Sequence, residues 1–252
     1  MLQGKVIIVT GGNKGIGLAI SKAAAKNGAK VVIGGRNLDE GERIVKQIHE
    51  SGGEALFYAG DLTDLSHCEN IIRRAVDTYG RLDGLVNYAG TTRSMAALID
   101  TSEDEFNFIF DTNFKSTFFV TKYALREMKN YGGSVIFMGS LHAYGGEGDR
   151  AAYACSKGAM LTLFKHVNKN YTKYKIRSNW ITIGWVATPG ELIFRQQQGK
   201  DQFWLEETGK KSFPMGRLQT EEDNVAAALF LLSDGASQVT GSEICISGGF
   251  TL

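Results

Sequence analysis

The amino-acid sequence predicts a doubly wound α/β domain, in which helices cover both faces of a parallel sheet of about seven strands. Short runs rich in Val and Ile alternate with longer amphipathic runs along the chain, which is typical of successive βα units. The apolar runs lack polar alternation, as strands buried on both faces do. Because 252 residues suit one large α/β core, we expect residues 1–252 to form a single domain.

The expected elements follow one another along the whole chain. Apolar runs predict strands at residues 5–10, 30–34, 55–59, 84–88, 134–139, 176–183 and 243–247. Helical spacing predicts helices at residues 15–27, 38–51, 65–79, 102–128, 152–172 and 221–232. We expect the helix at 102–128 to be bent or broken near Asn113. Residues 189–215 show no clear pattern, and we expect this irregular segment to close over a substrate.

Composition excludes several classes of protein. The chain is 43% hydrophobic, its net charge is +1, and its 31 Gly show no Gly-X-Y period, so it is neither disordered nor collagen-like. Balanced charges give no general attraction to nucleic acid, and no apolar run is long enough to span a membrane. The three cysteines and four histidines lack metal-ligand spacing, so no metal site is expected. Without a signal-peptide pattern, we expect a cytoplasmic protein.

A glycine-rich turn joins the first strand to the first helix. Residues 10–17 read Thr-Gly-Gly-Asn-Lys-Gly-Ile-Gly. A turn of this kind points backbone N–H groups and a helix N-terminus at a bound pyrophosphate, and the glycines let the phosphates approach closely. The turn therefore predicts a dinucleotide site, although a βα turn without a ligand could carry the same glycines.

The end of the second strand indicates which dinucleotide binds. NAD sites place Asp or Glu there to bind the ribose 2′-hydroxyl, but residues 34–37 read Gly-Gly-Arg-Asn. Arg36 could pair with a 2′-phosphate, and Lys14 in the glycine turn could add a second positive charge. NADP(H) is therefore favoured. NAD(H) stays possible, because both cations could equally be solvated surface residues.

A Tyr-x-x-x-Lys pattern opens the helix at 152–172. Tyr153 and Lys157 lie one turn apart on the same helix face. A neighbouring ammonium would lower the pKa of Tyr153 and suit its hydroxyl to proton transfer near neutral pH. Ser140 follows the fifth strand, where parallel strands line a ligand crevice, and could hydrogen-bond a carbonyl oxygen. Tyr and Lys are common on helix faces, so the glycine turn upstream gives this pattern its weight.

Together these motifs resemble the short-chain dehydrogenase/reductase family. The resemblance includes the glycine turn, Asn-Tyr-Ala-Gly at 87–90, Ser140 and the Tyr153 to Lys157 pattern, and it runs from Gly4 to residues 247–249. It implies a Rossmann-type fold and hydride transfer between NADP(H) and a carbonyl or secondary alcohol of a small molecule. It also implies a homotetramer or homodimer. The pattern is similar to 3-oxoacyl-carrier-protein reductases and sugar or polyol dehydrogenases.

The resemblance assigns a role to each matching position. Tyr153 would be the catalytic acid and base, Lys157 would lower its pKa, Ser140 would hold the substrate oxygen, and Asn113 would order a proton-relay water. The positions implied to contact the cofactor are Gly11, Asn13, Lys14, Gly15, Ile16, Gly17, Arg36, Asp61, Leu62, Asn87, Gly90, Tyr153, Lys157, Val186 and Thr188. We expect His142, Tyr144 and Trp185 to line the substrate pocket.

Two positions depart from the family's usual pattern. Tyr88 stands in place of an Asn, and Ile183 stands in place of a Pro beside the nicotinamide, where its presence is expected to loosen or reshape the loop. Two other functions remain open. One is an NAD-dependent dehydrogenase of a sugar or polyol, and the other is a non-catalytic dinucleotide-binding sensor, which the four filled catalytic positions disfavour. Sugars, 3-oxoacyl thioesters and steroids are all possible substrates, and a small polar hydroxy or oxo compound is favoured.

Overall fold

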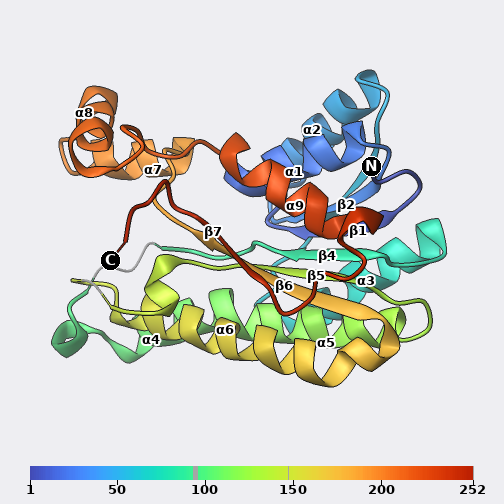
Figure 1. Ribbon diagram of the computed structural model, residues 1–252. Coiled ribbons are helices and arrows are strands. Elements are labelled where there is room, and N and C mark those ends of the chain that lie inside the picture. The colour runs from blue at the N-terminus through green and yellow to red at the C-terminus, as the bar shows by residue number, and fades with distance from the viewer. Residues whose placement is uncertain (93–95, 147, 252) are drawn as a thin grey trace.

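The computed structural model describes residues 1–92, 96–146 and 148–251. Within these residues, seven parallel strands form one sheet in the order β3-β2-β1-β4-β5-β6-β7, and helices cover both faces (Figure 1). The strands are β1 (Val6–Thr10), β2 (Lys30–Gly35), β3 (Glu54–Ala59), β4 (Gly84–Asn87), β5 (Gly133–Met138), β6 (Ile176–Ile183) and β7 (Glu243–Ile246). This arrangement confirms the doubly wound α/β fold.

The helices connect the strands, and each half of the doubly wound sheet has its connecting helices on one face. They are α1 (Gly15–Lys26), α2 (Leu38–Glu50), α3 (Leu65–Tyr79), α4 (Glu103–Phe110), α5 (Ser116–Met128), α6 (Ala151–Tyr171), α7 (Pro189–Gln196), α8 (Gln202–Ser212) and α9 (Val225–Leu232). In Figure 1, α1, α2 and α9 lie on one face, and α3, α5 and α6 lie on the other. No helix in the described part of the chain is long and apolar enough to cross a membrane.

Alternating side chains of each strand build two cores, one on each face of the sheet. Ile7 and Val9 of β1 pack in the same cluster as Ile20 of α1. Val6 and Ile8 face the other way and pack in the cluster that contains Phe164 of α6. Because both faces are covered, all five residues of β1 are buried, which explains why its first four residues are all apolar.

The strand order reverses between β1 and β4. The chain moves outward from β1 through β2 to β3, and then returns to place β4 on the other side of β1. In such a sheet the loops after these two strands diverge, which leaves a crevice at their carboxyl ends. The glycine turn follows β1 and Tyr88 follows β4, so both lie at this crevice.

The break expected near Asn113 is confirmed. Between α4 and α5, Asp111–Lys115 form a π-helical turn that contains the buried Asn113. Such wide turns insert one extra residue in a helix and are frequent at functional sites.

The expectation of an irregular segment at 189–215 is wrong, because α7 and α8 occupy most of it. The Thr188 hydroxyl accepts a hydrogen bond from the Glu191 backbone N–H (3.1 Å) at the start of α7, and Pro189 takes the first helical position. The Asp201 carboxylate accepts one from the Trp204 N–H (2.8 Å) and caps α8. These caps are sequence signals of helix starts, but the many charged residues of the segment obscure the helical spacing of its apolar residues.

Candidate active site

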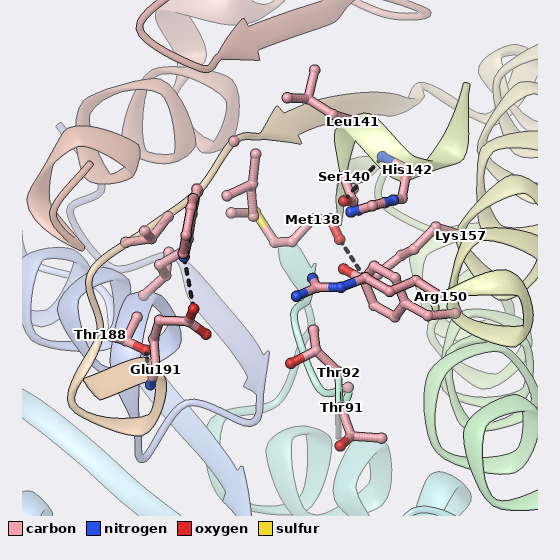
Figure 2. A pocket seen from close by; sticks show the side chains of 18 of the residues that line it. Thr91, Thr92, Met138, Ser140, Leu141, His142, Arg150, Lys157, Thr188 and Glu191 are labelled. Carbon is pink, nitrogen blue, oxygen red and sulfur yellow. Dashed lines mark hydrogen bonds between the residues drawn. The ribbon is translucent and has the colours of Figure 1, made fainter. Parts of the chain in front are cut away.

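A cavity of about 520 Å³ opens at the carboxyl ends of β4, β5 and β6, within the usual size range of small-molecule sites. Its wall is formed by the segments that follow these three strands, the start of α6, part of α7 and Phe250 (Figure 2). Ser140, Tyr153 and Lys157 all line it. The fold therefore brings together three of the four residues expected to be catalytic.

Tyr153 and Lys157 lie on successive turns of α6, and both are buried. The Lys157 Nζ lies 5.8 Å from the centre of the Tyr153 ring and donates a hydrogen bond to the Met138 carbonyl oxygen at 3.0 Å. Burial lowers the pKa of Lys157 to about 8, because removal from water disfavours the charged ammonium.

The pKa of Tyr153 differs from the sequence expectation. Burial raises it above its ordinary value, and a hydrogen bond from Ser140 and the positive charge of Arg150 act in the opposite direction. The expected lowering by Lys157 is not among these effects, and the Lys157 ammonium donates to the Met138 carbonyl. A raised pKa keeps the Tyr153 hydroxyl protonated at neutral pH, as a proton donor requires.

Ser140 is held by the short 3₁₀ turn Leu141–Ala143 that follows β5. Its hydroxyl accepts a hydrogen bond from the His142 backbone N–H at 3.2 Å. The His142 ring packs edge-on against the Tyr153 ring, with 5.6 Å between ring centres. The turn thus places a hydroxyl and an imidazole beside the tyrosine.

Asn113 lies behind the cavity wall and does not line it. Its side-chain oxygen accepts from the Thr91 N–H (2.7 Å), and its amide nitrogen donates to the Thr91 carbonyl (3.0 Å) and the Ser156 hydroxyl (3.1 Å). Thr91 itself lines the cavity. Asn113 therefore fixes the loop after β4 against α6.

The glycine turn forms a cradle that is tightly packed at its glycine positions. Gly11 and Gly15 have φ of +66° and +51°, a left-handed region that favours glycine. A Cβ on Gly17 would lie 2.5 Å from both the Gly11 carbonyl oxygen and the Tyr88 ring. Among the described residues no side chain caps the start of α1, so its first N–H groups suit a phosphate. The residues present therefore fit a dinucleotide.

Tyr88 packs beneath this cradle. Its hydroxyl would be 2.9 Å from a Cβ on Gly15, and it accepts a hydrogen bond from the Ile16 backbone N–H. Burial raises the pKa of Tyr88 to about 12, so this hydroxyl stays neutral. Tyr88, which departs from the family pattern, thus packs against the glycine turn and holds it by a hydrogen bond.

Two cations mark the far end of the cradle, and each lies near a carboxylate. The Arg36 guanidinium is 3.9 Å from Asp61, and the Lys14 ammonium is 3.6 Å from Glu40. Glu40 also accepts a hydrogen bond from the Asn13 amide at 2.7 Å. The side chains of Arg36 and Lys14 are 72% and 71% exposed, so water weakens both pairs.

The sequence and structure match known proteins over nearly the whole chain. A family profile described as enoyl-(acyl carrier protein) reductase matches residues 11–251. The chain belongs to the short-chain dehydrogenase/reductase family. It is 37% identical to an uncharacterized oxidoreductase of Thermotoga maritima, over 99% of this chain and 98% of that protein. It is 33% identical to a 3-oxoacyl-(acyl-carrier-protein) reductase of Chlamydia pneumoniae, over 99% and 98%.

Solved structures agree with this membership. A crystal structure assigned as a short-chain alcohol dehydrogenase of Sinorhizobium meliloti superposes with a TM-score of 0.90 at 30% identity, over 98% of this chain and 96% of that one. As a short-chain dehydrogenase/reductase, the chain is an oxidoreductase that uses an NAD(P) nucleotide and acts on alcohol or carbonyl groups of small molecules.

Other positions singled out by the short-chain dehydrogenase/reductase pattern separate into two groups. The residues that line the cavity are Ile16, Gly90, His142, Trp185, Val186 and Thr188. Asn87 is buried away from it and donates to the Thr121 hydroxyl at 3.0 Å, whereas Leu62 packs at the edge of the core beneath α3. The structure does not place Tyr144 in the pocket: its hydroxyl hydrogen-bonds Thr182 and Glu243, because the turn after Ser140 directs it toward β6 and β7.

Several cavity residues were not recognised from the sequence. Arg150 directly precedes α6, and its position three residues before Tyr153 was a usable signal because i and i+3 share a helix face. Glu191 accepts a hydrogen bond from the Trp185 indole (2.7 Å) and pairs with Arg195 at 2.8 Å. This pairing could not be read from the sequence, because Trp185 lies in a loop. No cluster of His, Cys, Asp and Glu in the described residues could hold a metal ion.

Proposed function

We propose that this chain reduces a carbonyl of a small molecule, or oxidises the matching secondary alcohol, with NADP(H) as cofactor and Tyr153 as the group that transfers the proton. The observation that carries the proposal is that Ser140, Tyr153 and Lys157 share one cavity beside a glycine cradle that suits a pyrophosphate. A site for hydride transfer needs both parts.

The preference for NADP(H) rests on the end of β2. It carries Arg36 and no carboxylate, and the surface pairs of Arg36 and Lys14 cost little to exchange for a 2′-phosphate. The glycine turn would bind the pyrophosphate, Asp61 and Leu62 the adenine, and Asn87 and Gly90 the adenosine side. Val186 and Thr188 would contact the carboxamide. When bound, the nicotinamide supplies or accepts the hydride.

The protein's own groups handle the oxygen and its proton. In the reduction direction, the Ser140 and Tyr153 hydroxyls donate hydrogen bonds to the substrate carbonyl oxygen, which stabilises the negative charge that develops there. The Tyr153 O–H bond breaks as the alcohol O–H bond forms. Lys157, with a pKa of about 8, can then return a proton to the tyrosine. Asn113 would order a proton-relay water that resupplies Lys157, and its hydrogen bonds hold Thr91, which lines the same cavity as Lys157.

Three broader proposals accompany this mechanism. Residues 1–252 act as one domain, and residues 189–215 close over the substrate, since this segment packs in a small apolar cluster with Trp185 and Phe250 of the cavity wall. The protein forms a homotetramer or homodimer, which is supported by a second, largely apolar hollow on α5 and α6. It acts in the cytoplasm, consistent with three cysteines that form no disulfide.

Substitution of the tyrosine tests the mechanism. Tyr153→Phe should lower kcat by roughly 10²–10⁴-fold, the usual contribution of acid–base catalysis, while the Kd for NADPH, measured by its fluorescence, stays unchanged. Tyr144→Phe is the matched control and should keep its activity, because that hydroxyl lies outside the cavity. Turnover at the wild-type rate in the Tyr153 variant would contradict the proposal.

A further inference from the structure

Arg150 directs a positive charge into the cavity. It lies immediately before α6, is half-buried and lines the cavity wall. Figure 2 shows its guanidinium pointing into the middle of the cavity, between Lys157 on one side and Thr188 and Glu191 on the other. Its charge also acts on the Tyr153 hydroxyl, where it opposes the larger effect of burial, which raises the pKa of that group. The guanidinium therefore lies near the place where the substrate's reacting oxygen binds.

The other cations of the cavity already have partners. The Arg195 guanidinium pairs with Glu191 at 2.8 Å and lies 4.7 Å from the centre of the Trp185 ring. The Lys157 ammonium donates to the Met138 carbonyl. Within the described residues, the Arg150 guanidinium has neither an ion pair nor a hydrogen bond, whereas the Arg150 backbone carbonyl accepts from the Ala154 N–H at 2.8 Å.

The anions of the cavity do not neutralise Arg150. Glu191 is held by Arg195 and by the Trp185 indole. Asp149 is exposed, so its carboxylate is solvated. A half-buried cation without a partner is costly, and the planar fork of a guanidinium binds carboxylate, sulfonate and phosphate groups through paired hydrogen bonds. A ligand that brings such a group would satisfy Arg150.

We propose that Arg150 binds an anionic group on the substrate, so that the substrate is a small oxo or hydroxy acid. This inference rests on the proposed function, because it places the acid's carbonyl or alcohol at Tyr153. The anionic group takes no part in the chemistry: the carbonyl carbon gains a hydride and its oxygen gains the Tyr153 proton. Val186 and Thr188, expected beside the nicotinamide, share the cavity, so its 520 Å³ leaves room only for a short acid.

Matched acids and amides test the proposal, because they differ in charge but hardly in shape. The probes are 2-hydroxybutanoate, 3-hydroxybutanoate and 4-hydroxypentanoate, each compared with its amide, with NADP⁺ as oxidant. A phosphate ester and a sulfonate of similar length identify the preferred anion. Wild type should favour at least one acid over its amide by about 10- to 100-fold in kcat/KM, the value of a hydrogen bond to a charged group.

Arg150→Met keeps the length of the side chain and removes its charge. It should abolish the preference for the acid, so that kcat/KM falls by more for the acid than for the amide, while Arg150→Lys should keep part of the preference. Arg43→Met, on the exposed face of α2, is the control and should match wild type. If Arg150 acted only through the pKa of Tyr153, the Met variant would change acid and amide alike, and that result would overturn the proposal.

Binding measurements separate this proposal from the proposed function. Calorimetry should show the acids binding to the NADPH-saturated wild type at least about 10-fold more tightly than to the Arg150→Met variant. If wild type oxidises none of the probes but binds acids in this Arg150-dependent way, the result supports the anion site and contradicts the proposed turnover. If turnover proceeds with no preference for acids, or with a preference that Arg150→Met retains, the result contradicts the anion site and supports the proposed function.

Discussion

On the cofactor side of the cleft, Lys14 and Arg36 lie 3.6 and 3.9 Å from the carboxylates of Glu40 and Asp61. On the substrate side, Arg150 is half-buried and no anion lies on it in the described part of the chain. Exposed pairs are weak and can exchange partners at little cost, whereas a partly buried cation gains more from a new anion. The burial of each cation and the presence of a partner, rather than the number of cations, therefore indicate which cations select the ligand on each side.

The two sides also differ in how they hold their shape. The cofactor side depends on backbone packed against backbone, with no room for a Cβ at Gly17. The substrate side depends on side chains, such as the Glu191 carboxylate between Arg195 and Trp185. Substitutions on the cofactor side should therefore disturb the backbone packing, whereas substitutions on the substrate side should change the interactions between charges.

Among the substitutions that compare the two sides, the largest effect is expected at Gly17. In Gly17→Ala, the new methyl group would meet the Gly11 carbonyl oxygen and the Tyr88 ring at 2.5 Å, and α1 would have to shift. We expect a loss of about 1–3 kcal/mol in the free energy of unfolding, typical of overpacking, and NADPH affinity at least about 10-fold weaker because the phosphate cradle moves.

The matched control on the substrate side is Gly158→Ala. The nearest atom to its new Cβ, the Ala143 carbonyl oxygen, is 3.8 Å away. Inside α6 this substitution should be neutral or stabilise by up to about 1 kcal/mol. Thermal unfolding and NADPH fluorescence check both variants, and equal losses in the two would contradict the contrast between the sides.

A smaller effect is expected from the surface cations of the cofactor side. Arg36→Ala should weaken NADP(H) binding by about 10-fold, the value of one charge-assisted contact, and leave NAD(H) binding unchanged. Glu40→Gln should strengthen NADP(H) binding by about two- to three-fold, because it frees Lys14 from its ion pair. Kd values for both cofactors measure these effects. Equal weakening of NADP(H) and NAD(H) by Arg36→Ala would favour the NAD-dependent alternative.

The sequence predicted the parts of the molecule that depend on short-range patterns. Apolar runs located the seven strands, and the glycine turn and the Tyr153 to Lys157 spacing located the crevice. It did not reveal what depends on burial and direction in space. The Lys157 ammonium points at the Met138 carbonyl, and burial raises the pKa of Tyr153. Likewise, Glu40 approaches Lys14 across 26 residues of chain only because β1 and β2 pair in parallel.

The last effect concerns Lys157, which lies where the two sides meet. Its pKa is about 8 in the folded protein and 10.5 ordinarily. Below pH 8 both the folded and unfolded states hold the proton, and the cost of burying the charge is present in full. As pH rises above 8, the folded state loses this proton first, so the unfolded state binds more protons and the free energy of unfolding increases.

The raised pKa of Tyr153 acts with the opposite sign, because above pH 10 the unfolded state loses the tyrosine proton first. The window for Lys157 is therefore pH 8 to 10. In urea denaturation across this window, the free energy of unfolding of wild type should rise relative to Lys157→Met, which carries no titrating group at this position. Parallel pH curves for the two proteins would show that the ammonium keeps its charge at no cost, through its hydrogen bond to Met138.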